Sequence, residues 1–151
     1  MKDDTVSLVN QRWVQGWNIN ASGTLFGGAL MSWCDEDATL LVRNNCRNEI
    51  TTVGADRIRF ISPAEIGDRL KFEHRIVHVG RCSMTVLSKV YVINDDSSVL
   101  CYEVYTTLCA IDDNFKPTAW SLKPGLMSIY KDLEQEDEWK RVEEMRKLRR
   151  T

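Results

Sequence analysis

The sequence predicts an α+β protein in which one helix packs on a face of a mostly antiparallel sheet. One segment repeats apolar residues at three- and four-residue steps, as a helix does, and four later segments have an extended pattern. Short turns join the four extended segments without an intervening helix, so the strands are expected to run antiparallel. The length of 151 residues fits one domain, and an apolar content of 43% can form its core.

The first elements follow from residue patterns in chain order. Residues 5–17 favour β structure and predict an N-terminal strand, and residues 18–23 are small, polar and glycine-bearing, which is typical of a loop. Residues 25–44 predict the helix, with Arg43 near its negative end. The apolar face of this helix comprises Leu30, Met31, Cys34, Ala38, Leu41 and Val42.

Extended patterns dominate the chain after the helix. The first of them is rich in β-branched residues, and the others alternate apolar and polar positions between turn clusters. His74 and His78 are expected to share one face of the second strand because they are an even number of residues apart. The four strands are predicted over residues 51–61, 69–79, 83–93 and 99–111.

The C-terminal segment, residues 133–150, predicts a charged helix. Acidic residues lead and basic residues finish, which complements the helix dipole. The expected role is a solvent-exposed helix or one that packs on another subunit. We therefore predict a domain over residues 1–130 and a charged helical extension over residues 131–151. A thin apolar stripe on this helix comprises Trp139, Val142, Met145 and Leu148.

The charge balance gives no reason to expect a nucleic acid or a membrane as partner. The chain has 20 basic and 22 acidic residues and a formal net charge of −2. No run approaches the roughly 18–20 apolar residues that a membrane-spanning helix needs. Residues 1–4 lead into no apolar signal segment, so a cytoplasmic protein is expected.

Metal ligation and Ser or Cys nucleophilic chemistry are not expected. The five cysteines are widely spaced and form no C-x-x-C pair, so free and mostly buried thiols are predicted. His74 and His78 have no evident third ligand, and packed or surface histidines are the expectation. Cys82 and Ser83 lie at a predicted turn, but no nucleophile-elbow motif surrounds them. No metal or organic cofactor is predicted.

Paired glycines, Gly27 and Gly28, stand near the start of the predicted helix. The first N–H groups of a helix lack intrahelical partners and lie at the positive end of its dipole, so they can polarise a carbonyl. The glycines can equally serve close packing or a tight turn, and their spacing alone does not separate these roles.

Three acids follow on the same helix. At about 100° per residue, Glu36 points away from the apolar face, whereas Asp35 and Asp37 flank it on opposite edges. An Asp at the margin of an apolar face can act as a general base or nucleophile in a cleft. Periodicity does not choose between Asp35 and Asp37.

The motif N-x-x-G-x-x-F-G-G, from Asn20 to Gly28, followed by Asp35, resembles the signature of hotdog-fold acyl-CoA thioesterases. With Phe before the glycines, it is most similar to the group of bacterial YciA and animal brain-type acyl-CoA hydrolases. The similarity extends over about residues 18–111. Glu36 and Asp37 depart from this group, in which small or neutral residues often follow the Asp, and this departure bears on substrate preference.

The resemblance implies a hotdog fold, a five-stranded antiparallel sheet wrapped around one long central helix, and acyl-CoA hydrolysis to a free acid and CoA. The Gly28 N–H, with Gly27 nearby, would polarise the thioester carbonyl. Asp35 from the partner subunit would activate water or attack the carbonyl, and Asn20 would orient the water or the thioester. A homodimer is the implied minimal unit, and trimers of dimers are frequent in the group.

The resemblance also implies where the substrate binds. Phe26 and Gly27 would contact the substrate, and the Gly80-Arg81-Cys82-Ser83 bend would lie along the pantetheine arm, where Gly80 permits close backbone approach. Arg81 is our choice for a contact to the CoA phosphates. The other candidates for that contact are Arg57, Arg59, Lys71, Lys89 and Lys116.

Two alternatives to the hydrolase stay open. A hotdog domain can bind acyl-CoA without catalysis, although the combined presence of Asn20, Gly27, Gly28 and Asp35 argues against this. A hotdog hydratase or dehydratase commonly carries an Asp–His pair early in the helix, and this helix contains no His.

Overall fold

The computed structural model of the chain describes residues 4–149. The strands predicted over residues 69–79 and 83–93 have those bounds in the structure, and the helix predicted over 25–44 and the strands over 51–61 and 99–111 differ only at their ends. The N-terminal strand is shorter than predicted, since it covers residues 7–13 and not 5–17. Arg150, the last residue of the predicted C-terminal helix, lies outside the described residues. The elements are η1 (Asp4–Val6), β1 (Ser7–Trp13), η2 (Gly16–Asn18), α1 (Gly27–Arg43), β2 (Glu49–Phe60), β3 (Arg69–Val79), β4 (Ser83–Ile93), β5 (Ser98–Ile111), α2 (Leu126–Leu133) and α3 (Asp137–Arg149).

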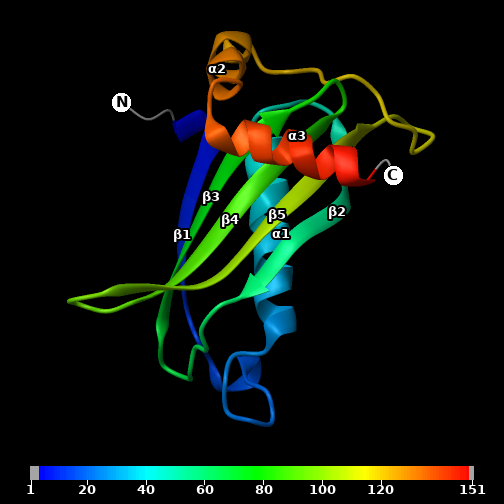
Figure 1. Ribbon diagram of the computed structural model, residues 1–151. Coiled ribbons are helices and arrows are strands. Elements are labelled where there is room, and N and C mark those ends of the chain that lie inside the picture. Colours follow the sequence, from blue (N-terminus) through cyan, green and yellow to red (C-terminus); the bar gives the residue numbers. More distant parts are fainter. Residues whose placement is uncertain (1–3, 150–151) are drawn as a thin grey trace.

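The five strands form one antiparallel sheet in the order β1-β3-β4-β5-β2. α1 lies along one face of this sheet, so the predicted α+β architecture of a sheet around one long helix is confirmed (Figure 1). β1 and β2 are the edge strands, and each has one row of backbone hydrogen-bonding groups that no strand within residues 4–149 pairs.

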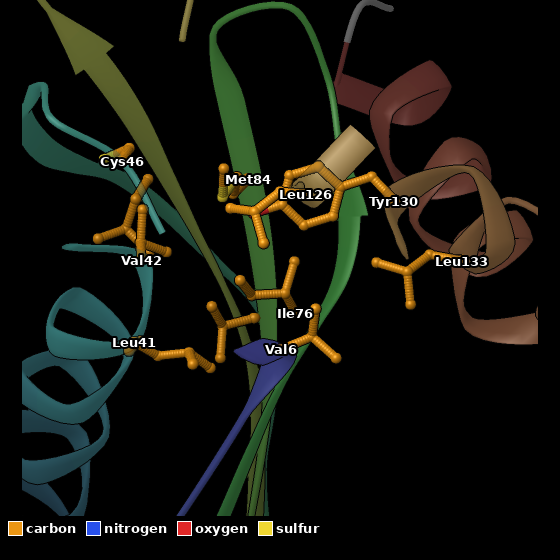
Figure 2. Packing of buried hydrophobic residues seen from close by; sticks show 12 residues of the cluster. Val6, Leu41, Val42, Cys46, Ile76, Met84, Leu126, Tyr130 and Leu133 are labelled. Atoms are coloured by element: carbon orange, nitrogen blue, oxygen red, sulfur yellow. The ribbon is translucent and has the colours of Figure 1, made fainter. Parts of the chain in front are cut away.

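The main core lies between the second half of α1, the sheet and α2. Leu41 from α1, Ile76 from β3 and Met84 from β4 are almost fully buried there. Leu126 and Tyr130 from α2 close this end of the core (Figure 2). α2 was not predicted, and the expected boundary between residues 130 and 131 falls inside it.

α3 crosses the face of the sheet opposite to α1 (Figure 1). Its buried residues Val142 and Met145 pack with Val77, Leu87 and Tyr105 from the sheet. The expectation of a solvent-exposed helix is therefore wrong, because Val142 and Met145 of the apolar stripe pack within the chain, whereas Leu148 is 69% exposed.

The prediction that His74 and His78 share a strand face is also wrong. The pairing of β3 with β4 shifts register between Ile76 and His78, so β3 carries a bulge there. An extra residue in one strand reverses the alternation of side chains beyond it. His74 consequently contacts α1, whereas His78 contacts Glu143 and Trp139 on α3.

Within residues 4–149, no helix is long and apolar enough to cross a bilayer. Over the same residues, no group of three or more His, Cys, Asp or Glu side chains could hold a metal ion. The five cysteines are free and all but Cys82 are buried, as predicted. Burial raises the pKa of Cys34 to about 12, which keeps this thiol protonated and unreactive.

Candidate active site

The first turn of α1 presents its backbone N–H groups without a side-chain cap. Phe26 is the N-cap residue, and its side chain has no oxygen that could accept hydrogen bonds from those groups. The Ala29 N–H donates to the Phe26 carbonyl at 3.0 Å, whereas the N–H groups of Gly27 and Gly28 precede the first helical hydrogen bonds and lie at the positive end of the dipole. The start of α1 can therefore polarise a carbonyl oxygen or stabilise an oxyanion.

Two aromatic rings flank the paired glycines. A Cβ atom at position 28 would collide with the ring of Phe26, and one at position 27 would lie 3.0 Å from the ring of Phe60. Both rings are largely exposed, at 56% for Phe26 and 57% for Phe60. A side chain at position 28 would thus have to displace the Phe26 ring, and the same packing leaves the N–H groups between two apolar surfaces.

Asn20 shapes the loop that leads into α1. Its Oδ1 accepts hydrogen bonds from the backbone N–H groups of Ser22 at 2.9 Å and Thr24 at 3.2 Å. The Asn20 amide is thereby oriented, and its Nδ2 group is the part that can donate to a substrate. Asn20, Gly27 and Phe60 line one cavity of about 440 Å³.

Asp35 lies further along α1 and is exposed. Thr52 on β2 donates a hydrogen bond from Oγ1 to Asp35 Oδ1 at 2.6 Å. At a rise of 1.5 Å per residue, about 10 Å of helix separates Asp35 from Gly28. The carboxylate therefore cannot act on a carbonyl bound at the first turn of its own helix.

Asp37 has the opposite environment, since it is only 6% exposed. Its carboxylate accepts hydrogen bonds from Asn10 at 3.0 Å and Arg12 at 3.2 Å on β1, and from His74 Nε2 at 2.9 Å on β3. Ser88 Oγ on β4 lies 2.7 Å from His74 Nδ1. Periodicity did not decide which acid, Asp35 or Asp37, could act as a base or nucleophile. In the structure Asp37 is bound to the sheet by its hydrogen bonds, whereas Asp35 is accessible to solvent.

The electrostatics of Asp37 reflect this network. Burial by itself raises the pKa of the carboxyl group, but the hydrogen bonds from His74 and Asn10 and the charges nearby, including Arg12, outweigh burial and lower it. Asp37 is therefore a buried carboxylate whose charge its partners stabilise, rather than a group that exchanges protons at neutral pH.

The Gly80 bend joins β3 to β4 at the end of the sheet opposite to the first turn of α1 (Figure 1). The Gly80 N–H donates to the Ser83 carbonyl at 2.7 Å, and the Trp120 indole N–H donates to the same carbonyl at 3.3 Å. Arg81 is exposed at this bend. Since β3 has 11 residues, it places the bend roughly 35 Å from the start of that strand.

The predicted site residues therefore occupy three places within one chain. The loop and first turn of α1 hold four of them, Asp35 stands apart beside β2, and the Gly80 bend holds the rest. Thr52 was not predicted, because a threonine in a β-branched strand gives no signal of its own. Only the crossing of β2 over α1 brings it to Asp35.

Residues 22–99 match the family model described as the thioesterase superfamily. An acyl-CoA thioester hydrolase of Zymomonas mobilis, itself uncharacterised, is 34% identical over 102 residues, which are 66% of this chain and 68% of that protein. The acyl-CoA thioester hydrolase YciA of Escherichia coli is 32% identical over 73 residues, which are 48% of this chain and 55% of that protein.

Solved acyl-CoA hydrolases share the fold. The Staphylococcus aureus acyl-CoA hydrolase, in complex with butyryl-CoA, CoA and CoA disulfide, has a TM-score of 0.77 and 26% identity, over 95% of this chain and 88% of that one. A hexameric thioesterase of Yersinia pestis has a TM-score of 0.68 and 27% identity, over 74% of this chain and 92% of that one. Other structures of the Staphylococcus enzyme carry single alanine substitutions of an Asn, an Asp or a Thr.

The resemblance drawn from the glycine pair and Asp35 is confirmed at the level of the family. The family model covers half of the chain, and the Zymomonas relative is aligned over most of its length. This chain belongs to the thioesterase superfamily.

Proposed function

We propose that the protein hydrolyses acyl-CoA thioesters to a free carboxylic acid and CoA. The observation that carries the proposal is the combination of an uncapped, glycine-lined helix start with an exposed carboxylate, Asp35, that Thr52 holds in place. The names of the relatives indicate the same reaction, and the Staphylococcus enzyme was solved with butyryl-CoA bound.

In the proposed mechanism, the N–H groups of Gly28 and Gly27 receive the thioester carbonyl oxygen and stabilise its developing negative charge. Asp35 takes a proton from water as the water attacks the carbonyl carbon, or attacks that carbon itself to form an anhydride that water then cleaves. In either route the C–S bond breaks and CoA leaves as the thiol. The Asn20 amide donates to the thioester or orients the water.

The site needs two chains, because Asp35 is too far from the first turn of its own helix. In one chain, Phe60 near the end of β2 lies against Gly27, and Thr52 near its start holds Asp35. Antiparallel pairing of two β2 edges about a twofold axis near their middle would set position 52 of one strand opposite position 60 of the other. Asp35 of the partner subunit would then face the glycine amides.

The surface beside β2 fits this pairing. Val53 and Phe60 on β2 are 56% and 57% exposed, and Met31 and Leu40 on α1 are 43% and 52% exposed. Apolar side chains that gather beside an unpaired strand edge mark an interaction surface. We propose a homodimer as the minimal unit and a trimer of dimers as the assembly, in line with the hexameric Yersinia thioesterase.

The substituted positions in the Staphylococcus enzyme support the choice of residues. The numbers of its substituted Asn, Asp and Thr have the same spacing as Asn20, Asp35 and Thr52 in this chain. We therefore propose Thr52 as a positioning residue for Asp35. Phe26 and Gly27 are proposed for the acyl-thioester end of the substrate, and Gly80, Arg81 and Ser83 for the pantetheine arm.

A thiol-release assay tests the proposed function directly. The purified protein is expected to release CoA from acyl-CoAs, and a panel of short, medium, long and aromatic acyl groups identifies the best substrate. Acyl-CoA that binds tightly without thiol release would instead indicate a non-catalytic binding module. If the protein neither binds nor hydrolyses any acyl-CoA of the panel, the proposal is refuted.

Thr52→Ala is expected to lower kcat about 10- to 100-fold, because a carboxylate displaced by about 1 Å loses alignment with the reacting carbon. Thr52→Ser keeps the hydroxyl and is expected to keep most of the activity. Steady-state kinetics with the best acyl-CoA measure both variants. Equal losses in Thr52→Ala and Thr52→Ser would show that the methyl group matters rather than the hydrogen bond to Asp35.

A further inference from the structure

Two cysteines, Cys82 and Cys109, lie next to each other at the Gly80 bend. Cys109 is on β5 and pairs with Ser83, the first residue of β4, so Cys82 is one position away from the residue opposite to Cys109. The thiols of Cys82 and Cys109 are hydrogen-bonded to each other, and Cys109 Sγ lies 3.3 Å from the Ala110 carbonyl oxygen. Neither thiol has a part in the proposed hydrolysis.

The backbone geometry permits a covalent bond between the two sulfurs. Residues directly opposite in an antiparallel pair have Cα atoms about 4.5–5.5 Å apart, and one step along a strand adds about 3.4 Å at right angles. The Cα atoms of Cys82 and Cys109 are therefore about 6 Å apart, which is within the range of disulfides. In a regular strand the two side chains would point to opposite faces, but Cys82 precedes β4 and lies in the bend, where this alternation does not apply.

Access to solvent distinguishes this pair from the other cysteines. Cys82 is partly exposed, and Cys109 is buried next to it. Cys34 and Cys101 also belong to one core cluster, but each of them is only 1% exposed. Burial raises the pKa of Cys34 to about 12 and that of Cys101 to about 11, so both thiols stay protonated. Cys82 is therefore the thiol that a reagent in solution reaches first.

The charges around the pair suit an attack by Cys82 that Cys109 then completes. Arg81 is exposed next to Cys82, and its positive charge attracts an anionic reagent to this thiol. Burial and the adjacent Cys82 thiol raise the pKa of Cys109, and the charge of Arg81 partly opposes this rise. When Cys82 has reacted, its thiol no longer contributes to the rise, so Cys109 is the second thiol to react.

We propose that Cys82 and Cys109 form a reversible disulfide by exchange with a small-molecule disulfide, and that this cross-link lowers acyl-CoA hydrolysis. In the first step the Cys82 thiolate attacks one sulfur of the small disulfide, whose S–S bond breaks and releases one thiol. Cys109 then loses its proton to water, and its sulfur attacks that of Cys82 and expels the second thiol. Two protein thiols are oxidised, and one small disulfide is reduced to two thiols.

The effect on hydrolysis rests on the proposed function, because it needs the pantetheine arm to lie along the Gly80 bend. A disulfide brings the two sulfurs to about 2.0 Å, which is much shorter than a hydrogen-bond contact. The bend must therefore move toward β5, and with it Ser83, whose carbonyl accepts the N–H groups of Gly80 at 2.7 Å and Trp120 at 3.3 Å. A shift of about 1 Å along the arm misplaces the thioester relative to Asp35 and lowers the rate.

Peptide mapping after treatment with glutathione disulfide tests the cross-link. The wild-type protein is expected to yield one cross-linked peptide that joins Cys82 to Cys109, while Cys34 and Cys101 remain free thiols. Cys109→Ser is expected to keep glutathione bound to Cys82, because the second thiol is absent, and Cys82→Ser is expected to take up none. An unmodified Cys82 in the wild type, or glutathione that stays on Cys82 there, would overturn the inference.

Kinetics of the reduced and oxidised protein test the effect on hydrolysis. For the best acyl-CoA, kcat/KM of the oxidised wild type is expected to be about tenfold lower than that of the reduced protein, and dithiothreitol is expected to restore it. Cys82→Ser is expected to have the same kcat/KM before and after glutathione disulfide. The assay follows the thioester absorbance, because a disulfide-based thiol reagent would itself oxidise the pair.

The two measurements separate this inference from the hydrolytic function. A cross-linked protein with unchanged kcat/KM would refute the effect on hydrolysis. If the reduced protein hydrolyses no acyl-CoA, the proposed function fails, and the peptide map still decides whether Cys82 and Cys109 form the disulfide.

Discussion

Asp35→Asn is expected to lower kcat by roughly 10²- to 10⁴-fold, the usual contribution of a positioned acid or base. The amide is nearly isosteric with the carboxylate and can still accept the Thr52 hydrogen bond, so the fold is expected to stay intact. It can neither take a proton from water nor attack the thioester carbonyl. Thiol-release kinetics measure the loss, and calorimetry with CoA is expected to show unchanged binding.

Glu36→Gln is the control for the removal of a negative charge from α1. Glu36 is the adjacent acid on the helix and is exposed like Asp35, but it has no proposed part in the reaction. This variant is expected to keep turnover within about twofold of wild type, because the Glu36 side chain points about 100° away from that of Asp35 around the helix and exposed charges contribute little. An Asp35→Asn enzyme with near wild-type kcat would remove Asp35 from the mechanism.

Mixing two inactive chains tests the shared site. Gly28→Ala places a Cβ against the Phe26 ring and disturbs the proposed oxyanion site. In a dimer of one Asp35→Asn chain and one Gly28→Ala chain, one of the two sites keeps both the native Asp35 and the native Gly28. Random reassembly of equal amounts is expected to restore about a quarter of wild-type activity. No recovery above the two separate variants would place the site within one chain.

Regular periodicity accounts for the elements that the sequence predicted well. Turn clusters flank β3 and β4 on both sides, so their bounds agree with prediction. α1 was recognisable because its apolar residues repeat over several turns. α2 was missed although Leu126, Tyr130 and Leu133 have helical spacing, because it is one short element behind a glycine turn and a short apolar run is ambiguous.

Long-range contacts and backbone irregularities account for the rest. The bulge between Ile76 and His78 leaves no mark in residue order, and it reversed the predicted face of His78. The choice between Asp35 and Asp37 depends on β1 and β3, which bring Arg12 and His74 to one acid only. Sequence periodicity placed both acids at the margins of the helix face, but Asp37 is buried with that face and Asp35 is exposed. Periodicity carries no information about partners from distant strands.

Asp37→Ala is expected to destabilise the protein by about 3 kcal/mol or more, because removal of one partner from a buried ion pair leaves the other groups uncompensated. Arg12, His74 and Asn10 would each lose the carboxylate that they contact in the native structure. For a chain of this length, a loss of that size lowers Tm by roughly 6–12 °C. Thermal melts at equal protein concentration measure it, since Tm of an oligomer depends on concentration.

The exposed pair of Arg43 and Glu49 provides the matched control, since the side chain of Glu49 is 74% exposed. Glu49→Ala also removes one carboxylate next to an arginine, and a Tm change within about 2 °C is expected because exposed ion pairs contribute little. A comparable loss in both variants would show that Asp37 is no more important than a surface charge.

Acidification gives an independent measure of the Asp37 network. Its pKa is lower in the folded chain than its ordinary value, so the folded state binds the proton less readily than the unfolded state does. The stabilisation is therefore complete above about pH 4, the ordinary Asp value, and is lost as the pH falls through the folded-state pKa. Asp37→Asn has no proton to gain at this position, and its Tm is expected to decline less steeply below pH 4 than that of wild type. Parallel declines would mean that other carboxylates account for the acid sensitivity and that the contacts from His74 and Asn10 do not stabilise the charge.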